Sequence, residues 1–285
     1  MKFRGKICEQ ACIKQFTSII STLAKLAKMC TLRITSSHLY FVVMEATLSS
    51  TPGLWCELQQ GHFFNEFNME GVSPEHNEIY LELKPDNLAR TLSILKSSAA
   101  VRSLKIKLTK KHSACLTFEI ESPSQTSLSR LCTHDIPVTV LPRRLWAGLA
   151  EPRLPQFSVS LDLPALRLLR PVVERMRAIG PRLTVSASCS GRFVLRVESD
   201  QAVVATHFGQ LRTHPAGDEA AGGDDVDSEH MFDVQVEIKP FSMFLAGDQF
   251  HPARAVCNLV EDRMLHLFLI HDDITLQYFI PACSS

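Results

Sequence analysis

Two stretches of this chain have the pattern of the same strand-to-helix unit. Apolar residues recur at every second position of residues 78–83, which is typical of a strand with one buried face. From Pro85, which suits the first position of a helix, they recur at helical spacing up to Leu95. The pattern returns at residues 233–244. The matching pairs are Ile79 with Val234, Leu81 with Val236, Leu83 with Ile238, Pro85 with Pro240 and Leu88 with Met243.

A repeat at this separation predicts two copies of one fold. The length of 285 residues agrees with two domains of about 140 residues each. We place the first domain at residues 1–140 and the second at 157–285. Between them, residues 141–156 contain three prolines and predict an extended connector. Residues 213–230 hold six acids and no Lys or Arg, which predicts a flexible acidic loop.

The bulk composition is that of an ordinary globular protein, with 45% apolar residues and 30 acids balanced by 30 Lys and Arg. No overall positive charge therefore argues for nucleic acid, so any such argument depends on where charges are placed. Nine scattered cysteines predict reduced thiols inside the cell rather than a disulfide framework. The N-terminal residues lack the apolar core of a signal peptide, and no apolar run is long enough to span a membrane.

The expected elements are short strands, mostly in hairpins, with two longer helices in each half. Helices are predicted at 11–28, after Pro85, at 164–179 and at 240–250, and a hairpin at 104–109 and 114–120. Two helices can cover one face of the antiparallel strands in each half. The predicted fold class is therefore α+β, with two similar domains of antiparallel sheet and two helices each.

The first helix of each half carries its charges on one side. In 11–28 the apolar face consists of Phe16, Ile19, Leu23 and Leu26, and the opposite side of Lys14, Ser18, Ser21, Lys25 and Lys28. In 164–179 the residues predicted to point inward are Leu168, Leu169, Val172, Met176 and Ile179, opposite Arg167, Arg170 and Arg177. Pro171 predicts a kink in this helix or marks its start. Such a face is either solvated or a surface that meets phosphates by shape.

No phosphate-binding loop, dinucleotide fingerprint or nucleophile elbow occurs in the sequence. His134-Asp135 and His271-Asp272-Asp273 are expected at matching places in the two halves, and could serve a metal-dependent nuclease or be duplicated turn residues. Cys8 and Cys12 could bind a metal only with two further ligands. We therefore predict a binding protein, with no catalytic residue, metal or cofactor.

Several stretches resemble the Hus-one family of checkpoint clamp proteins, which are subunits of the nine-one-one complex. They extend from the start of the chain nearly to its end. They include Met1-Lys-Phe-Arg, Phe63-Phe-Asn-Glu-Phe, Met69-Glu-Gly-Val-Ser, Asn77–Leu83, Lys105-Ile-Lys-Leu-Thr, Thr133-His-Asp-Ile-Pro, Pro142-Arg-Arg-Leu-Trp, Val173-Glu-Arg-Met, Phe244-Leu-Ala-Gly and Leu276-Gln-Tyr-Phe-Ile-Pro-Ala.

This resemblance implies a sliding-clamp fold and one third of a heterotrimeric ring with Rad-nine and Rad-one type subunits. A clamp loader would place the ring on double-stranded DNA in the nucleus, without sequence specificity, and repair enzymes would be recruited there. The residues that would face DNA are Lys14, Lys25, Lys28, Arg90, Lys96, Arg167, Arg170 and Arg177. Edge strands near 130–138 and 201–208 would pair with neighbouring subunits, through Leu131, Thr133, Ile136, Val203, Ala205 and His207.

Two further alternatives follow from the residues. The apolar connector residues Leu141, Pro142, Leu145 and Trp146 predict either packing on their own domain or a docking strip for partner peptides. Pro171 and the acidic loop depart from the family pattern, so a diverged member could act instead as an adaptor. Such an adaptor would bind one partner subunit and would not encircle DNA.

Overall fold

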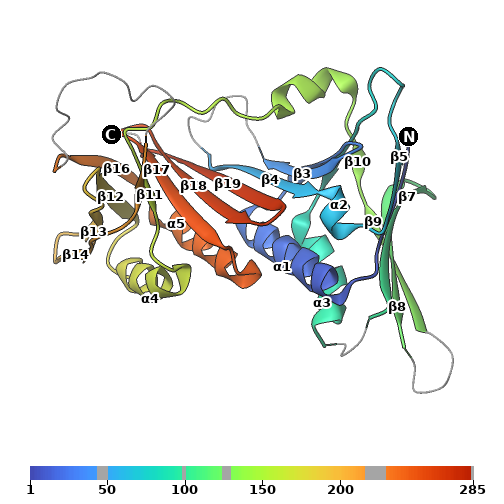
Figure 1. The fold of residues 1–285 in the computed structure, drawn as a ribbon, viewed down its shortest axis with the longest axis horizontal. Helices are drawn as coiled ribbons and strands as arrows, with labels where there is room; N and C mark the ends of the chain where they lie inside the picture. Colours follow the sequence, from blue (N-terminus) through green and yellow to red (C-terminus); the bar gives the residue numbers. More distant parts are fainter. Residues whose placement is uncertain (44–50, 98–100, 124–129, 216–228, 284–285) are drawn as a thin grey trace. The chain divides into compact units, whose positions relative to one another are not determined.

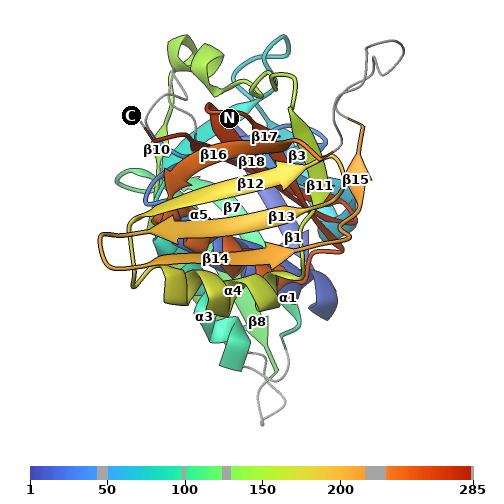
Figure 2. The same ribbon diagram turned by 90° about the vertical axis from the view of Figure 1, so that its left-hand side faces the viewer.

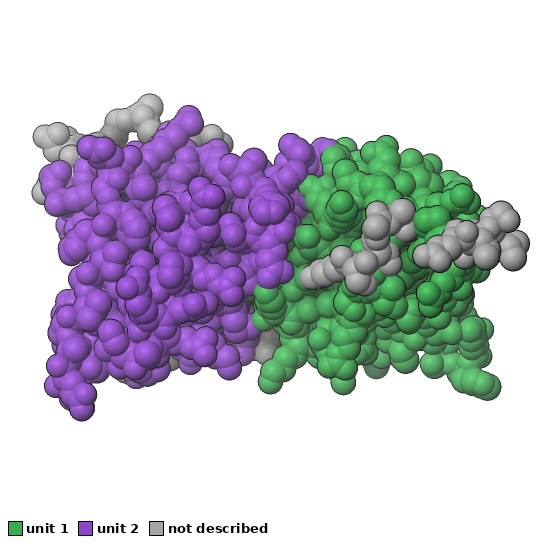
Figure 3. Space-filling view, turned by 90° about the horizontal axis from the view of Figure 1, so that it is seen from below, with its two compact units in different colours: residues 1–43, 55–150 green, residues 44–54, 151–285 purple. Residues whose placement is uncertain are grey.

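The computed structural model describes residues 1–43, 51–97, 101–123, 130–215 and 229–283. The described chain divides into two compact units (Figure 3). Unit 1 comprises residues 1–43 and 55–150, and unit 2 comprises 151–285 with residues from 44–54. Unit 1 thus ends at Ala150, inside the segment predicted as the connector.

Unit 1 contains two antiparallel layers and two principal helices (Figure 1). One layer has the strand order β5-β1-β7-β8-β9 and the other β10-β6-β2-β3-β4. The strands are β1 Lys2–Ile7, β2 Cys30–Ile34, β3 His38–Val43, β4 Gly53–Gln59, β5 Glu66–Glu70, β6 Ile79–Leu83, β7 Ser103–Lys110, β8 Ala114–Ser122, β9 Arg130–Pro137 and β10 Thr139–Val140. The helices are α1 Gln10–Leu26, the short α2 Gln60–Phe63, α3 Pro85–Ser97 and the 3-10 helix η1 Arg143–Leu149.

Unit 2 repeats this plan, with the layers β15-β11-β17-β18-β19 and β16-β12-β13-β14 (Figure 2). Its strands are β11 Val159–Asp162, β12 Arg182–Ser188, β13 Phe193–Glu198, β14 Val203–Phe208, β15 Thr213–His214, β16 Met231–Glu237, β17 Arg254–Val260, β18 Met264–His271 and β19 Ile274–Pro281. Its helices are α4 Leu166–Met176, α5 Ile238–Phe244 and the 3-10 helix η2 Leu245–Phe250.

The two strand orders correspond position by position, which confirms the predicted duplication of an α+β fold. β5-β1-β7-β8-β9 matches β15-β11-β17-β18-β19, and β6-β2-β3-β4 matches β16-β12-β13-β14. The repeated stretch has the same surroundings in both copies. Leu81 on β6 lies opposite Leu32 on β2, and its counterpart Val236 on β16 lies opposite Leu183 on β12. These side chains are nearly or fully buried, so the alternation noted in the sequence reflects a real core face.

The helices of each unit bury the residues that the periodicity selects. In α1 the predicted apolar residues Phe16, Ile19, Leu23 and Leu26 are all buried, and α1 packs against α3. In unit 2, α4 packs against α5 and η2. Several hydroxyl-bearing residues of α1 satisfy their side chains within the helix, since Ser21 Oγ donates to the Thr17 carbonyl at 2.8 Å. Ser21 is buried and does not belong to the exposed face predicted for it.

The prediction for the second-half helix was partly wrong. α4 begins at Leu166 and ends at Met176, and it buries Leu166, Leu169, Val173 and Met176. Leu168, predicted to point inward, is 58% exposed because the buried stripe is displaced by one position. Pro171 lies inside the helix rather than at its start. The Arg167 carbonyl, which has no N–H at Pro171 to accept from, belongs to an exposed residue where water can reach it.

Two predicted loops contain regular structure. Arg143–Leu149, expected to be extended, forms η1, and Thr139–Val140 pairs with Glu82 and Leu81 as β10. At the start of the predicted acidic loop, Thr213–His214 pairs with β11. The rest of that loop, residues 216–228, lies outside the described residues. Among the described helices, none is long and apolar enough to cross a membrane.

Candidate functional site

The basic residues predicted on α1 are at the two ends of the helix. Lys14 lies in its first half and Lys25 in its last turn, and both side chains are exposed. Lys28 is exposed just beyond the end of the helix at Leu26. Because Ser21 is buried between them, these lysines form two separate positive positions rather than the continuous stripe expected from the sequence.

The basic residues of α3 are partly neutralised. Arg90 is exposed, but its Nη2 lies 2.6 Å from Asp86 Oδ2 one turn earlier. Lys96 belongs to α3, and its side chain lies outside the described part. Sequence reasoning missed Lys84, which is exposed immediately before this helix.

Arg167, Arg170 and Arg177 of unit 2 are exposed along α4 and at its C-cap, as predicted. Arg170 Nε forms an ion pair with Glu174 Oε1 at 3.0 Å, so its charge is shared with a carboxylate. Arg175 is a further exposed cation that the sequence reading did not select, and its Nε donates to the Pro171 carbonyl at 3.2 Å. Exposed arginine on both sides of Pro171 means that the proline does not remove the basic face.

β9 and β14 are terminal strands of their sheets. β9 pairs with β8 and β14 with β13, and neither has a second neighbour among the described residues. On β9, Leu131 is 59% exposed and Thr133 is exposed, on the same face. Ile136 is on the opposite face and only 3% exposed, so the prediction that its side chain lies at a subunit interface does not fit its burial.

The predicted residues of β14 share one exposed face. Val203 is 55% exposed, and Ala205 and His207 follow at alternate positions with exposed side chains. A valine this exposed on a terminal strand, with unpaired backbone groups beside it, is a feature that proteins usually cover with a partner. Figure 2 shows β14 at the outer border of its sheet.

The connector residues pack on their own unit through one side chain. Trp146 of η1 stacks on Tyr80 of β6, and its Nε1 donates to the Leu141 carbonyl at 3.1 Å. The Leu141 N–H in turn donates to the Tyr80 carbonyl at 2.9 Å. Pro142 is exposed and Leu145 is 50% exposed, whereas Leu141 is half-buried. The packing alternative thus applies to Trp146, and a docking strip would present Pro142 and Leu145.

A cluster of charged and aromatic residues that sequence reasoning missed holds Tyr80. The guanidinium of Arg33 lies 5.0 Å from the Tyr40 ring centroid and 5.7 Å from that of Tyr80. It donates two hydrogen bonds to Glu78, at 3.0 and 2.9 Å, and the Tyr80 hydroxyl donates to the same carboxylate at 2.7 Å. Burial acts to raise the pKa of Glu78, but these hydrogen bonds outweigh it and the pKa is lowered.

The residues proposed for a nuclease do not assemble. Asp135 of β9 accepts hydrogen bonds from Lys111 and Thr117, which lower its pKa and occupy its oxygens. Asp272 lies at the turn between β18 and β19 in unit 2, so the two His-Asp pairs are not at equivalent places, contrary to the prediction. No group of three or more potential metal ligands occurs within the ranges that the structure describes. Cys12 is buried, and its Sγ contacts Glu9 and the His62 carbonyl.

The duplicated units with their helices and terminal strands define the sliding-clamp fold. The crystal structure of Proliferating Cellular Nuclear Antigen from Entamoeba histolytica matches 99% of both chains with a TM-score of 0.73. The sequence identity of this pair is 11%, so the match concerns the fold alone.

Within this class, the chain belongs to the family of Hus1-like proteins, whose model matches residues 1–284. It is 47% identical to Checkpoint protein HUS1 of Homo sapiens over 284 residues, which cover 100% of both chains. It is also 28% identical to Checkpoint protein Hus1-like of Drosophila melanogaster over 286 residues, 99% of each chain. The family predicted from the sequence is thereby confirmed.

Proposed function

We propose that the chain is a non-catalytic subunit of a heterotrimeric checkpoint clamp that encloses double-stranded DNA and recruits signalling and repair proteins. The observation that carries the proposal is the position of the two terminal strands. In the duplicated plan β9 corresponds to β19 and β14 to β4, so the two edges are not equivalent positions of the repeat. Pairing between non-equivalent edges is head-to-tail, and such contacts generate rings when the rotation closes.

Edge pairing would use backbone groups of β9 and β14, with Leu131 and Val203 as the exposed apolar side chains beside them. Neither strand repeats the side-chain pattern of the other, so different subunits can provide the complementary edges. A ring of three different chains would then include two partners of Rad-nine and Rad-one type. A clamp loader would open this ring at DNA.

Exposed cations on the principal helices support contact with phosphates. Lys14 and Lys25 of α1, and Arg167 of α4, are exposed on helices whose opposite faces are buried. No sequence-reading element is needed, because phosphate contacts position a protein without specifying bases. The checkpoint names of the relatives agree with a role in the DNA-damage response, for which we propose a nuclear location.

The mass of the complex formed with both candidate partner subunits tests the assembly. We expect one copy of each of three clamp chains. A stable pair that excludes the third chain would instead identify an adaptor that captures one partner and does not encircle DNA. An activity assay with Mg²⁺ or Mn²⁺ on nicked DNA tests the absence of catalysis, since metal-dependent cleavage that is lost in Asp135→Ala would contradict it.

A charge-reversal variant tests the DNA-facing helix. Lys25→Glu with Lys28→Glu should weaken retention of the assembled complex on circular DNA. It should also reduce the slope of log K against log salt by about 0.9 for each phosphate that the protein no longer neutralises. Lys110→Glu is the matched control, because Lys110 is an exposed lysine of unit 1 at the end of β7. Equal retention by the double variant and the control would count against a DNA-facing α1.

A further inference from the structure

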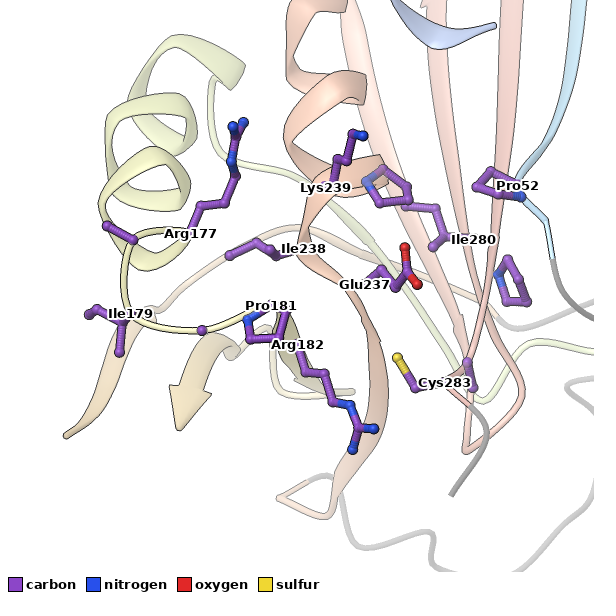
Figure 4. A pocket seen from close by; sticks show the side chains of 15 residues that line it. Pro52, Arg177, Ile179, Pro181, Arg182, Glu237, Ile238, Lys239, Ile280 and Cys283 are labelled. Atoms are coloured by element: carbon purple, nitrogen blue, oxygen red, sulfur yellow. The ribbon is translucent and has the colours of Figure 1, made fainter. Parts of the chain in front are cut away.

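A pocket of about 840 Å³ lies entirely within unit 2 (Figure 4). Three segments form most of it: the loop from α4 to β12, the junction of β16 with α5, and the end of β19 with the residues that follow it. Its volume is within the range of pockets that hold small ligands or peptide side chains. The strip Leu141–Trp146 belongs to unit 1, so this pocket is a different surface from the connector.

The walls of the pocket are apolar and stiff. Four prolines line it, namely Pro52, Pro181, Pro240 and Pro281, together with isoleucine side chains. Proline has no N–H group, so these wall positions offer a ligand no backbone donors. Its fixed φ angle also limits rearrangement of the wall, which lowers the conformational cost of binding. A ligand would therefore bury apolar groups against the walls and find its hydrogen-bond donors elsewhere.

The donors that are available are cationic side chains. Arg177, Arg182 and Lys239 line the pocket, are exposed, and form no ion pair with a described carboxylate. Glu237 is the single acid in the lining. Figure 4 shows Glu237 and Cys283 between Lys239 on one side and Arg182 on the other. The charges of Arg182 and Glu237 also act on the Cys283 thiol, whose pKa is raised first by burial.

We infer that this pocket is a docking site for an acidic peptide segment of another protein, with an aliphatic side chain as its anchor. The aliphatic group would pack against the proline walls, while aspartate or glutamate carboxylates would accept hydrogen bonds from Arg182 and Lys239. A DNA duplex is too wide to enter the pocket and could use only its rim cations, which leaves the apolar wall without a role. The site goes beyond the proposed clamp function, because it requires neither ring closure nor DNA.

Fluorescence anisotropy of the full chain with short labelled peptides tests the inference. The probe is fluorescein-GDELIDEG, compared with GDEGGDEG, which lacks the aliphatic pair, and GKKLIKKG, which reverses the charge. We expect the first probe to bind most tightly, and removal of the aliphatic pair to weaken binding at least about fivefold. Equal binding of GDELIDEG and GKKLIKKG, or of GDELIDEG and GDEGGDEG, would overturn the inference.

Variants locate the binding to the pocket. Arg182→Glu with Lys239→Glu should weaken the first probe at least about tenfold, because two charge-assisted contacts become repulsive. Arg212→Glu alters an exposed arginine of unit 2 outside the pocket lining and should leave binding unchanged. If Arg212→Glu weakens binding as much, the attraction is diffuse and the site does not exist. If a 20-base-pair duplex displaces the peptide from the wild type, the cations belong to a nucleic-acid surface and the peptide site is wrong.

Discussion

The indole ring of Trp146 lies against the phenol ring of Tyr80, with the ring centroids 4.4 Å apart and 23° between the ring planes. This stack fixes η1 on β6, next to the two-residue strand β10. In unit 2, Phe157 stacks on His266 with centroids 5.6 Å apart, and Gln277 donates to Glu151. Residues at both ends of the 141–156 segment are therefore held by their own units, each through an aromatic pair that periodicity alone does not indicate.

Replacing Trp146 should destabilise unit 1 and leave unit 2 intact. We expect Trp146→Ala to lower the free energy of unfolding by about 1–2 kcal/mol, because it removes an aromatic pair and the hydrogen bond to Leu141. Trp55 is then the single tryptophan left in the chain and reports unfolding of unit 1 by fluorescence in urea. Trp146→Phe, which retains the stack, should be less destabilised. A Trp146→Ala variant as stable as the wild type would show that the connector does not depend on this contact.

Arg33 should contribute through its shape as well as its charge. Arg33→Lys keeps the charge, but it cannot form both hydrogen bonds to Glu78 or lie as a plane between Tyr40 and Tyr80. We expect a decrease in the free energy of unfolding of about 1–2 kcal/mol. A double-mutant cycle with Glu78→Gln measures the coupling, and additive effects of the two changes would contradict the proposed pair.

Acid should destabilise unit 2 through His266. This imidazole is buried, bonded to Asn258 and Gln277, and burial lowers its pKa from 6.5 to about 4. The unfolded chain therefore binds the proton first, and stability falls as the pH drops from about 6.5 to 4, by about 3 kcal/mol in all.

Other groups contribute to acid sensitivity in the same direction, so the His266 effect must be read as a difference. Asp162, for example, has a lowered pKa because its hydrogen bonds from Arg254 and His214 outweigh its burial. His266→Gln keeps polar atoms near Asn258 and Gln277 but removes the titrating group. Its urea unfolding free energy should depend on pH less steeply than that of the wild type between pH 6.5 and 4. Parallel curves for the two proteins would mean that His266 does not titrate as described.

Two substitutions on β9 should have opposite consequences. Leu131→Asp alters an exposed side chain, so we expect the free energy of unfolding to change by less than about 0.5 kcal/mol while binding of a clamp partner is abolished. Ile136→Ala removes a buried side chain and should cost about 2–4 kcal/mol of stability. Analytical size exclusion and urea unfolding separate the two effects. Undiminished assembly by Leu131→Asp would exclude β9 as the interface.

The repeated pattern at 78–95 and 233–244 was enough to predict the duplication, because alternation and helical spacing report which faces are buried. It could not locate boundaries such as the start of α4. There Leu168 and Leu169 are equivalent to a periodicity argument, and only packing selects Leu169. Ile136 failed for a related reason, since an edge strand has one face turned to its own core. The cluster around Arg33 joins residues from β2, β3 and β6, and no local pattern connects them.

Retention on DNA of different topology is the sharpest measurement of the proposed ring. The complex with both partner subunits is loaded onto nicked circular DNA, washed at high salt and then exposed to a restriction enzyme that linearises the circle. We predict that the complex stays on the circle, where phosphate contacts are screened, and leaves once free ends are present. Equal release before and after linearisation, or equal retention on both, would contradict enclosure of DNA by this chain and its partners.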